Sequence, residues 1–169
     1  TPFEPLVPDV LHVSNTNRYR RPEGESDEEF TGLLLDELEE TIRQAGPETV
    51  AMVIMEPVQN AGGSFMPPAG YWAGVRELCD RYGILLCADE VINAFGRLGH
   101  WFASDRVGVV PDLITFAKGV TSAYQPLAGV VALVFAGLLG LALLRLRGHY
   151  FAIGSLVVAE VLRELVNAA

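Results

Sequence analysis

Three short apolar runs, separated by helical patterns, constrain the fold of this chain more than any other feature. They span residues 51–55, 84–87 and 113–116. Each run is short, and its apolar residues are continuous rather than alternating with polar ones, which is typical of strands buried on both faces. Strands of this kind that alternate with helices favour a parallel α/β sheet.

The segments between the runs carry the signals of helices. Ser26 precedes an apolar pattern of helical spacing, and Glu29 follows three residues later, which predicts a capping box at a helix start. A second helix is predicted over residues 71–82, ended by Gly83. Residues 93–111 are rich in loop residues and contain one short helical stretch.

Each apolar run is followed by a residue that can do chemistry: Glu56, Asp89 and Lys118. The carboxyl ends of parallel strands meet at one edge of a sheet, where α/β proteins bind ligands. One interpretation is a salt bridge that closes this edge. The other is a covalent carbonyl site, in which a buried lysine with a lowered pKa forms an imine. The pattern alone leaves both open.

Composition narrows the classes of partner. The chain has 21 acidic and 12 basic residues and a formal net charge of −9. Such a balance argues against nucleic-acid binding. Cys79 and Cys87 stand in apolar surroundings without a Cys-x-x-Cys or Cys/His cluster, so no metal site or disulfide is predicted. A reducing compartment fits this cysteine usage.

Five ordered motifs narrow the choice at the sheet edge. They are Glu-Pro-Val-Gln at 56–59, Pro-Pro-Ala-Gly-Tyr-Trp at 67–72, Ala-Asp-Glu-Val-Ile-Asn-Ala-Phe-Gly-Arg at 88–97, Pro-Asp-Leu-Ile-Thr-Phe-Ala-Lys-Gly at 111–119 and Ala-Tyr-Gln-Pro at 123–126. Their order and spacing resemble the class III aminotransferases of pyridoxal-phosphate fold type I. The resemblance is closest to the omega-transaminases that use pyruvate as amino acceptor. It covers about residues 5–128 and implies that residues 1–128 are part of the large, cofactor-binding domain, with a partial parallel sheet.

The resemblance also implies roles for the residues at the sheet edge. Lys118, the only lysine in the chain, would be the Schiff-base lysine for pyridoxal 5′-phosphate. Asp89 would face the pyridine nitrogen and keep it protonated, so that the ring can accept electrons. Val91 would pack on the ring, and Glu56 would lie near Asp89. Glu90 is expected to be a structural partner only.

For the protein as a whole, the resemblance implies transamination between a small amine donor and a 2-oxo acid such as pyruvate. It also implies a homodimer with shared active sites and a cytoplasmic location. The family's phosphate-binding cup and small C-terminal domain find no counterpart in this sequence. We therefore expect an incomplete chain that is inactive alone. A non-catalytic domain that keeps the sheet is the alternative.

The C-terminal part departs from the aminotransferase pattern. Residues 127–144 contain no charged side chain and have about the length that spans a bilayer. Arg145 and Arg147 would flank such a span on the cytoplasmic side. Residues 129–169 resemble a membrane segment of branched-chain amino-acid ABC transporter permeases, so an apolar helical tail inserted in a membrane is predicted. A buried core helix or strand is the alternative for this run, and a permease fragment is the alternative function.

Overall fold

The computed structural model describes residues 4–5 and 7–132 of the chain. The chain divides into two compact units, Thr1–Val130 and Val131–Ala169. The description below concerns the first unit and the two residues that follow it.

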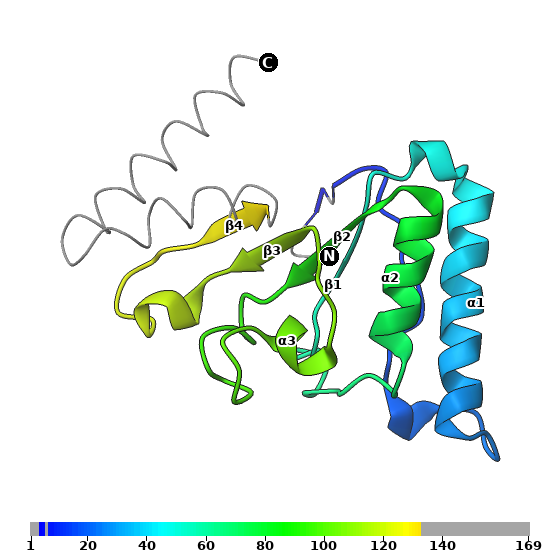
Figure 1. Cartoon of the computed structure of the whole chain (residues 1–169), viewed down its shortest axis with the longest axis horizontal. Helices are drawn as coiled ribbons and strands as arrows, with labels where there is room; N and C mark the ends of the chain where they lie inside the picture. The colour runs from blue at the N-terminus through cyan, green and yellow to red at the C-terminus, as the bar shows by residue number, and fades with distance from the viewer. Residues whose placement is uncertain (1–3, 6, 133–169) are drawn as a thin grey trace. The chain divides into compact units, whose positions relative to one another are not determined.

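A sheet of short strands organises this unit. Its strands are β1 (Met52–Met55), β2 (Leu85–Asp89), β3 (Leu113–Phe116) and β4 (Gly129–Ala132), and they lie in the order β1-β2-β3-β4 (Figure 1). Both β1–β2 and β2–β3 are parallel pairs. Their carboxyl ends therefore share one edge of the sheet, as the sequence predicts.

Two helices that run parallel to each other complete the unit, α1 (Asp27–Ala45) and α2 (Tyr71–Tyr82), with the short helix α3 (Ala103–Val107) near the carboxyl edge of the sheet (Figure 1). Helix α2 contacts β2, and α1 contacts α2. The helices therefore form two successive layers beside one face of the sheet.

The strand register separates a covered face from an open one. Leu86 and Ala88 of β2 and Ile114 of β3 are buried, at 0, 0 and 5% exposure. The opposite face is exposed to solvent at β1 and at the start of β2. Met52 of β1 is 41% exposed, and its register partner, Leu85 of β2, is 48% exposed. Parallel sheets are normally covered on both faces. The described residues leave this second face open at β1 and at the start of β2, whereas Cys87 on the same face is only 2% exposed.

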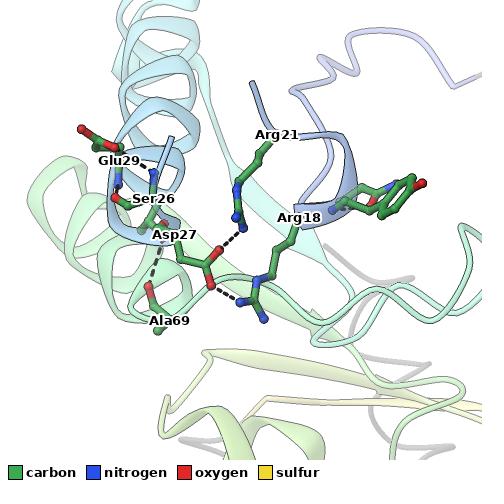
Figure 2. A network of polar contacts seen from close by, with 9 residues as sticks. Arg18, Arg21, Ser26, Asp27, Glu29 and Ala69 are labelled. Atoms are coloured by element: carbon green, nitrogen blue, oxygen red, sulfur yellow. Dashed lines mark hydrogen bonds and ion pairs between the residues drawn. The ribbon is translucent and has the colours of Figure 1, made fainter. Parts of the chain in front are cut away.

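Polar contacts fix the start of α1. The Ser26 side chain accepts a hydrogen bond from the Glu29 amide, and Glu29 accepts one from the Ser26 amide, which is the predicted capping box. Figure 2 shows Asp27 facing two guanidinium groups, those of Arg18 and Arg21. The distance from Arg21 Nη1 to Asp27 Oδ1 is 2.6 Å. The segment before α1 is thereby tied to the first turn of the helix, where negative charge is favourable.

The predicted elements over residues 26–116 are confirmed, including the short helical stretch in the loop-rich region, which is α3. The predicted apolar helical tail from residue 129 is wrong in its first four residues, because Gly129–Ala132 form β4. β-Branched Val130 and Val131 suit a strand that extends an existing sheet. The rest of the predicted tail and of the permease-like segment lies outside the described residues. No helix among those the structure describes is long and apolar enough to span a bilayer.

The two cysteines are buried and unpaired, as expected. Burial raises the pKa of the Cys79 thiol to about 11 and that of Cys87 above its ordinary value. Both thiols therefore remain protonated at neutral pH and act as small apolar side chains of the core.

Candidate active site

The carboxyl edge of the sheet brings the predicted residues to neighbouring positions. Asp89 is the last residue of β2, and Glu56 follows the end of β1 directly. Lys118 begins a 3-10 turn, Lys118–Thr121, two residues after the end of β3. The lysine and the aspartate thus leave adjacent, paired strands.

One oxygen of the Asp89 carboxylate is held by two donors. Its Oδ1 accepts a hydrogen bond of 2.9 Å from the Thr115 hydroxyl and one of 3.1 Å from the Val91 amide. The other oxygen, Oδ2, has no hydrogen-bond partner among the described residues. The carboxylate is half-buried. One acceptor oxygen is therefore fixed, and the second remains available to a ligand.

The backbone at Lys118 is strained. Its φ is +43°, in the left-handed region that residues with a side chain rarely adopt. Ser122 and Ala123 in the same loop also have positive φ, at +52° and +63°. Such strain costs about 1–3 kcal/mol per residue and clusters at functional sites. The sequence-based expectation of a buried lysine is wrong for the described residues: Lys118 stands on the turn that follows β3, and its side chain is exposed. It makes no hydrogen bond or ion pair within the part of the chain that the structure describes. Its amine is free to react.

Glu56 and Val91 also lie near this edge. Glu56 contacts the loop after β1, and Val91 contacts Asp89 through its backbone amide. The Glu56 carboxylate accepts a hydrogen bond of 3.0 Å from the Asn60 amide, which orders the loop after β1. No hydrogen bond joins Glu56 to Asp89 in the described residues. Val91 is half-buried and contributes its backbone amide to Asp89.

Glu90 is a structural residue, as predicted. Its side chain is fully buried and accepts hydrogen bonds from the amides of Ala103, at 2.5 Å, and Ser104, at 2.8 Å. These amides belong to the first turn of α3, where backbone amides have no partner within the helix, and Glu90 is their only acceptor among the described residues. Glu90 therefore fastens α3 to the end of β2, directly beside Asp89.

Aromatic packing joins the loop after β2 to the lysine loop. The Phe95 ring lies 5.8 Å from that of Phe116 and 5.9 Å from that of Phe102. A Cβ added at Gly119 would lie 3.2 Å from the Ala94 carbonyl oxygen and from Phe95 Cβ. The residue after the lysine thus has to be small, because it packs closely against the loop that follows Asp89.

Buried Asn93 connects the segments that follow β1 and β2, and replacing it should destabilise the fold. Its side-chain amide donates a 2.9 Å hydrogen bond to the Val58 carbonyl oxygen. We expect Asn93→Ala to lower the free energy of unfolding by about 1–2 kcal/mol, because a buried carbonyl would lose its donor. Urea unfolding followed by circular dichroism measures this. Asn60→Ala, at an exposed side chain, is the matched control. Equal stability of the two variants would contradict the assignment.

Sequence reasoning missed Thr115. The available signal was its position on the third predicted strand, three residues before Lys118. Only the register shows that Thr115 is paired with Asp89, so that the two side chains share a face of the sheet.

The residues present fit a cofactor that carries an aldehyde and a protonated ring nitrogen. Within the described part of the chain, the Lys118 amine and one Asp89 carboxylate oxygen have no partner. An amine on a strained loop suits covalent attachment, and a carboxylate oxygen suits a charged N–H donor. The described residues contain no group of three or more His, Cys, Asp or Glu side chains placed to hold a metal ion.

Comparison with known sequences identifies relatives over the same part of the chain. The family described as Aminotransferase class-III matches residues 1–133. A probable aminotransferase of Mycobacterium tuberculosis is 53% identical over 131 residues, covering 78% of this chain and 28% of the relative. The putrescine–pyruvate aminotransferase of Pseudomonas aeruginosa is 44% identical over 125 residues, covering 74% of this chain and 27% of the relative. The chain thus spans less than a third of the length of these curated relatives.

Solved structures agree. An (S)-enantioselective omega-transaminase from Thermomicrobium roseum aligns with a TM-score of 0.75 and 50% identity, covering 82% of this chain and 31% of that one. The omega-transaminase from Pseudomonas jessenii in complex with PMP aligns with a TM-score of 0.74 and 43% identity, covering 77% and 29%. The sheet and its helices are therefore those of the transaminase fold.

Proposed function

This chain belongs to the class-III aminotransferases, and we propose that it is the cofactor-anchoring part of an enzyme that transfers an amino group from a small amine to a 2-oxo acid such as pyruvate. The observation that carries the proposal is the arrangement at the ends of β2 and β3. There, Asp89, with one carboxylate oxygen that has no partner among residues 4–5 and 7–132, and Lys118, which has none among the same residues, leave adjacent parallel strands. The cofactor is pyridoxal 5′-phosphate, which the family uses and whose amino form accompanies the Pseudomonas jessenii structure.

Each residue at the edge has a distinct task. When bound, the cofactor supplies an aldehyde for imine formation and a protonated ring that accepts electrons. Lys118 would hold the cofactor covalently and, once released, would move a proton to and from the reacting carbon through Nζ. Asp89 would keep the ring nitrogen protonated through the negative charge of its carboxylate, with Oδ2 as the acceptor. Val91 would pack against the ring and exclude water.

Glu56 acts at longer range. Its carboxylate orders the turn to Asn60. From there it adds negative charge to the edge that Asp89 occupies, without touching the cofactor.

Several features of the whole enzyme are part of the same proposal. The amino acceptor is pyruvate, by likeness to omega-transaminases, and the intact protein is a homodimer in the cytoplasm. Residues 1–128 are one portion of its large domain. The groups that bind the cofactor phosphate and the substrate carboxylate belong to the part of the enzyme that this chain does not span, so the chain alone should not turn over substrate.

Covalent capture of the cofactor tests the proposal. We expect pyridoxal phosphate followed by borohydride to leave a stable adduct on Lys118, with saturable binding seen by visible absorbance. Because exposed amines react with pyridoxal phosphate unspecifically, saturation is the decisive property. Peptide mapping by mass spectrometry separates Lys118 from the terminal amine.

Two variants sharpen this test. Lys118→Ala should lose the adduct. Asp89→Asn should weaken binding about 10- to 100-fold, as expected for the loss of a charged hydrogen bond of about 1.5–3 kcal/mol, while the lysine remains available. Non-saturable labelling that is the same in wild type and Asp89→Asn would contradict the proposal.

A further inference from the structure

We propose that Thr115 is a positioning residue for Asp89. Its hydroxyl fixes one carboxylate oxygen so that the other faces the ring nitrogen of the cofactor. This inference rests on the proposed function for the identity of the ligand, but its geometric part concerns only two side chains of this chain.

The sheet places Thr115 for this task. Thr115 and Asp89 are register partners in the β2–β3 pair, so their side chains stand on the same face. That face is the one opposite α2. The hydroxyl donates to Asp89 Oδ1 at 2.9 Å, and the Thr115 carbonyl oxygen accepts from the Glu90 amide at 2.9 Å. Thr115 thus contacts the carboxyl end of β2 twice, at Asp89 through its side chain and at Glu90 through its backbone.

The carboxylate needs this second contact to keep one orientation. The χ1 angle of an aspartate can take three staggered values and its terminal torsion is broad, so a single hydrogen bond restrains the carboxylate weakly. The Val91 amide supplies only the longer contact, at 3.1 Å. With the Thr115 hydroxyl also on Oδ1, the two oxygens cease to be equivalent, and Oδ2 is left without a partner among the described residues.

Threonine suits the position better than its close relatives. Threonine is β-branched, which favours a strand and restricts χ1. The hydroxyl is therefore already oriented toward Asp89 before any ligand binds. Serine keeps the hydroxyl but has a freer χ1, and valine keeps the shape without the donor. Side chains on strands also hold a site more accurately than side chains on loops.

The first arm of the test needs no cofactor. In the isotope-labelled full chain, three-bond couplings report χ1 of Asp89, and hydrogen exchange reports the Val91 amide. We expect one Asp89 rotamer in wild type, rotamer averaging and several-fold faster Val91 exchange in Thr115→Val, and near wild-type values in Thr115→Ser. Thr41→Val is the matched control, because the Thr41 hydroxyl bonds a carbonyl oxygen within α1, far from β2 and β3 in the sequence. Unchanged couplings in Thr115→Val would overturn the proposal.

The second arm compares two ligands, pyridoxal phosphate and its 1-deaza analogue, whose ring lacks the nitrogen. Thr115→Val should bind pyridoxal phosphate about tenfold more weakly, the loss expected for one hydrogen bond to a charged group, and should bind the analogue as wild type does. Equal weakening of both ligands would mean a general structural role and would overturn the proposal.

The two arms separate the failure of this inference from the failure of the proposed function. If wild type binds neither ligand saturably, the proposed function fails, while the couplings of the cofactor-free chain still decide whether Thr115 positions Asp89. If wild type binds both and Thr115→Val changes neither affinity nor couplings, only the role of Thr115 is wrong.

Discussion

Replacing Glu90 by alanine should lower the free energy of unfolding by about 3 kcal/mol. The carboxylate is fully buried, and it is the acceptor for two backbone amides at the start of α3, those of Ala103 and Ser104. Alanine would leave both donors buried without a partner, at about 1–3 kcal/mol each, partly offset by entry of water. It would also remove a negative charge from a helix N-terminus.

Two further variants calibrate this result. Glu90→Gln keeps an acceptor for one amide and should lose about half as much stability. Glu28→Ala removes an exposed glutamate of α1 and should stay within about 0.5 kcal/mol of wild type. Chemical denaturation of the three variants is the measurement. Should Glu90→Ala unfold at the same denaturant concentration as Glu28→Ala, Glu90 does not secure α3.

The second large effect is expected at Asp112, which lies before β3 at the amino edge of the sheet. One of its carboxylate oxygens accepts a 2.8 Å hydrogen bond from the Leu86 amide and contacts the Arg76 guanidinium at 2.8 Å. The Asp112 amide also donates to the Leu86 carbonyl oxygen at 2.8 Å. Asp112→Ala should therefore cost about 2 kcal/mol, mainly through the lost charged hydrogen bond, because a side chain that is 39% exposed gains little from the ion pair.

The same residue predicts a pH dependence. Burial acts to raise the pKa of the Asp112 carboxyl, but the Leu86 amide and the Arg76 guanidinium outweigh it and hold the pKa below its ordinary value. A pKa that is lower in the folded state stabilises the fold above the unfolded pKa of about 3.9. That stabilisation is lost as the pH falls through the folded pKa.

Unfolding free energies of wild type and Asp112→Asn test this sign. The difference should be largest at pH 7 and should shrink below about pH 4, where the wild-type carboxyl takes up its proton. Asn60→Ala, which removes no titratable group, should show no such trend. A difference that grows with acidification would contradict the assignment.

The helices and parallel strands followed from the sequence because their signals are local. Ser26 and Glu29 mark a helix start by their spacing, and Gly83 ends α2 because its left-handed backbone, at a φ of +67°, suits glycine. The strand ends placed Asp89 and Lys118 on one edge for the same reason. Strand β4 was not predicted, because its residues continue into a longer apolar run in which a strand and a buried helix look alike.

The sequence predicts where the site residues stand along the chain relative to the strands, but not which side chains contact each other. That Asp89 follows one strand and Lys118 another can be read from the sequence. That the Thr115 hydroxyl meets Asp89, whereas Glu56 turns to Asn60, depends on register and side-chain rotation. Strain at Lys118 is likewise a property of its φ angle, which no composition or periodicity encodes.

The order β1-β2-β3-β4 also has a consequence for synthesis of the chain. Each strand lies beside the one made just before it, so the sheet can lengthen at a single edge while the ribosome is still translating. Translation adds about 5–20 residues per second, whereas local elements form in about microseconds. Each new strand can therefore pair with its finished neighbour as it emerges, and no earlier pair has to open to admit it.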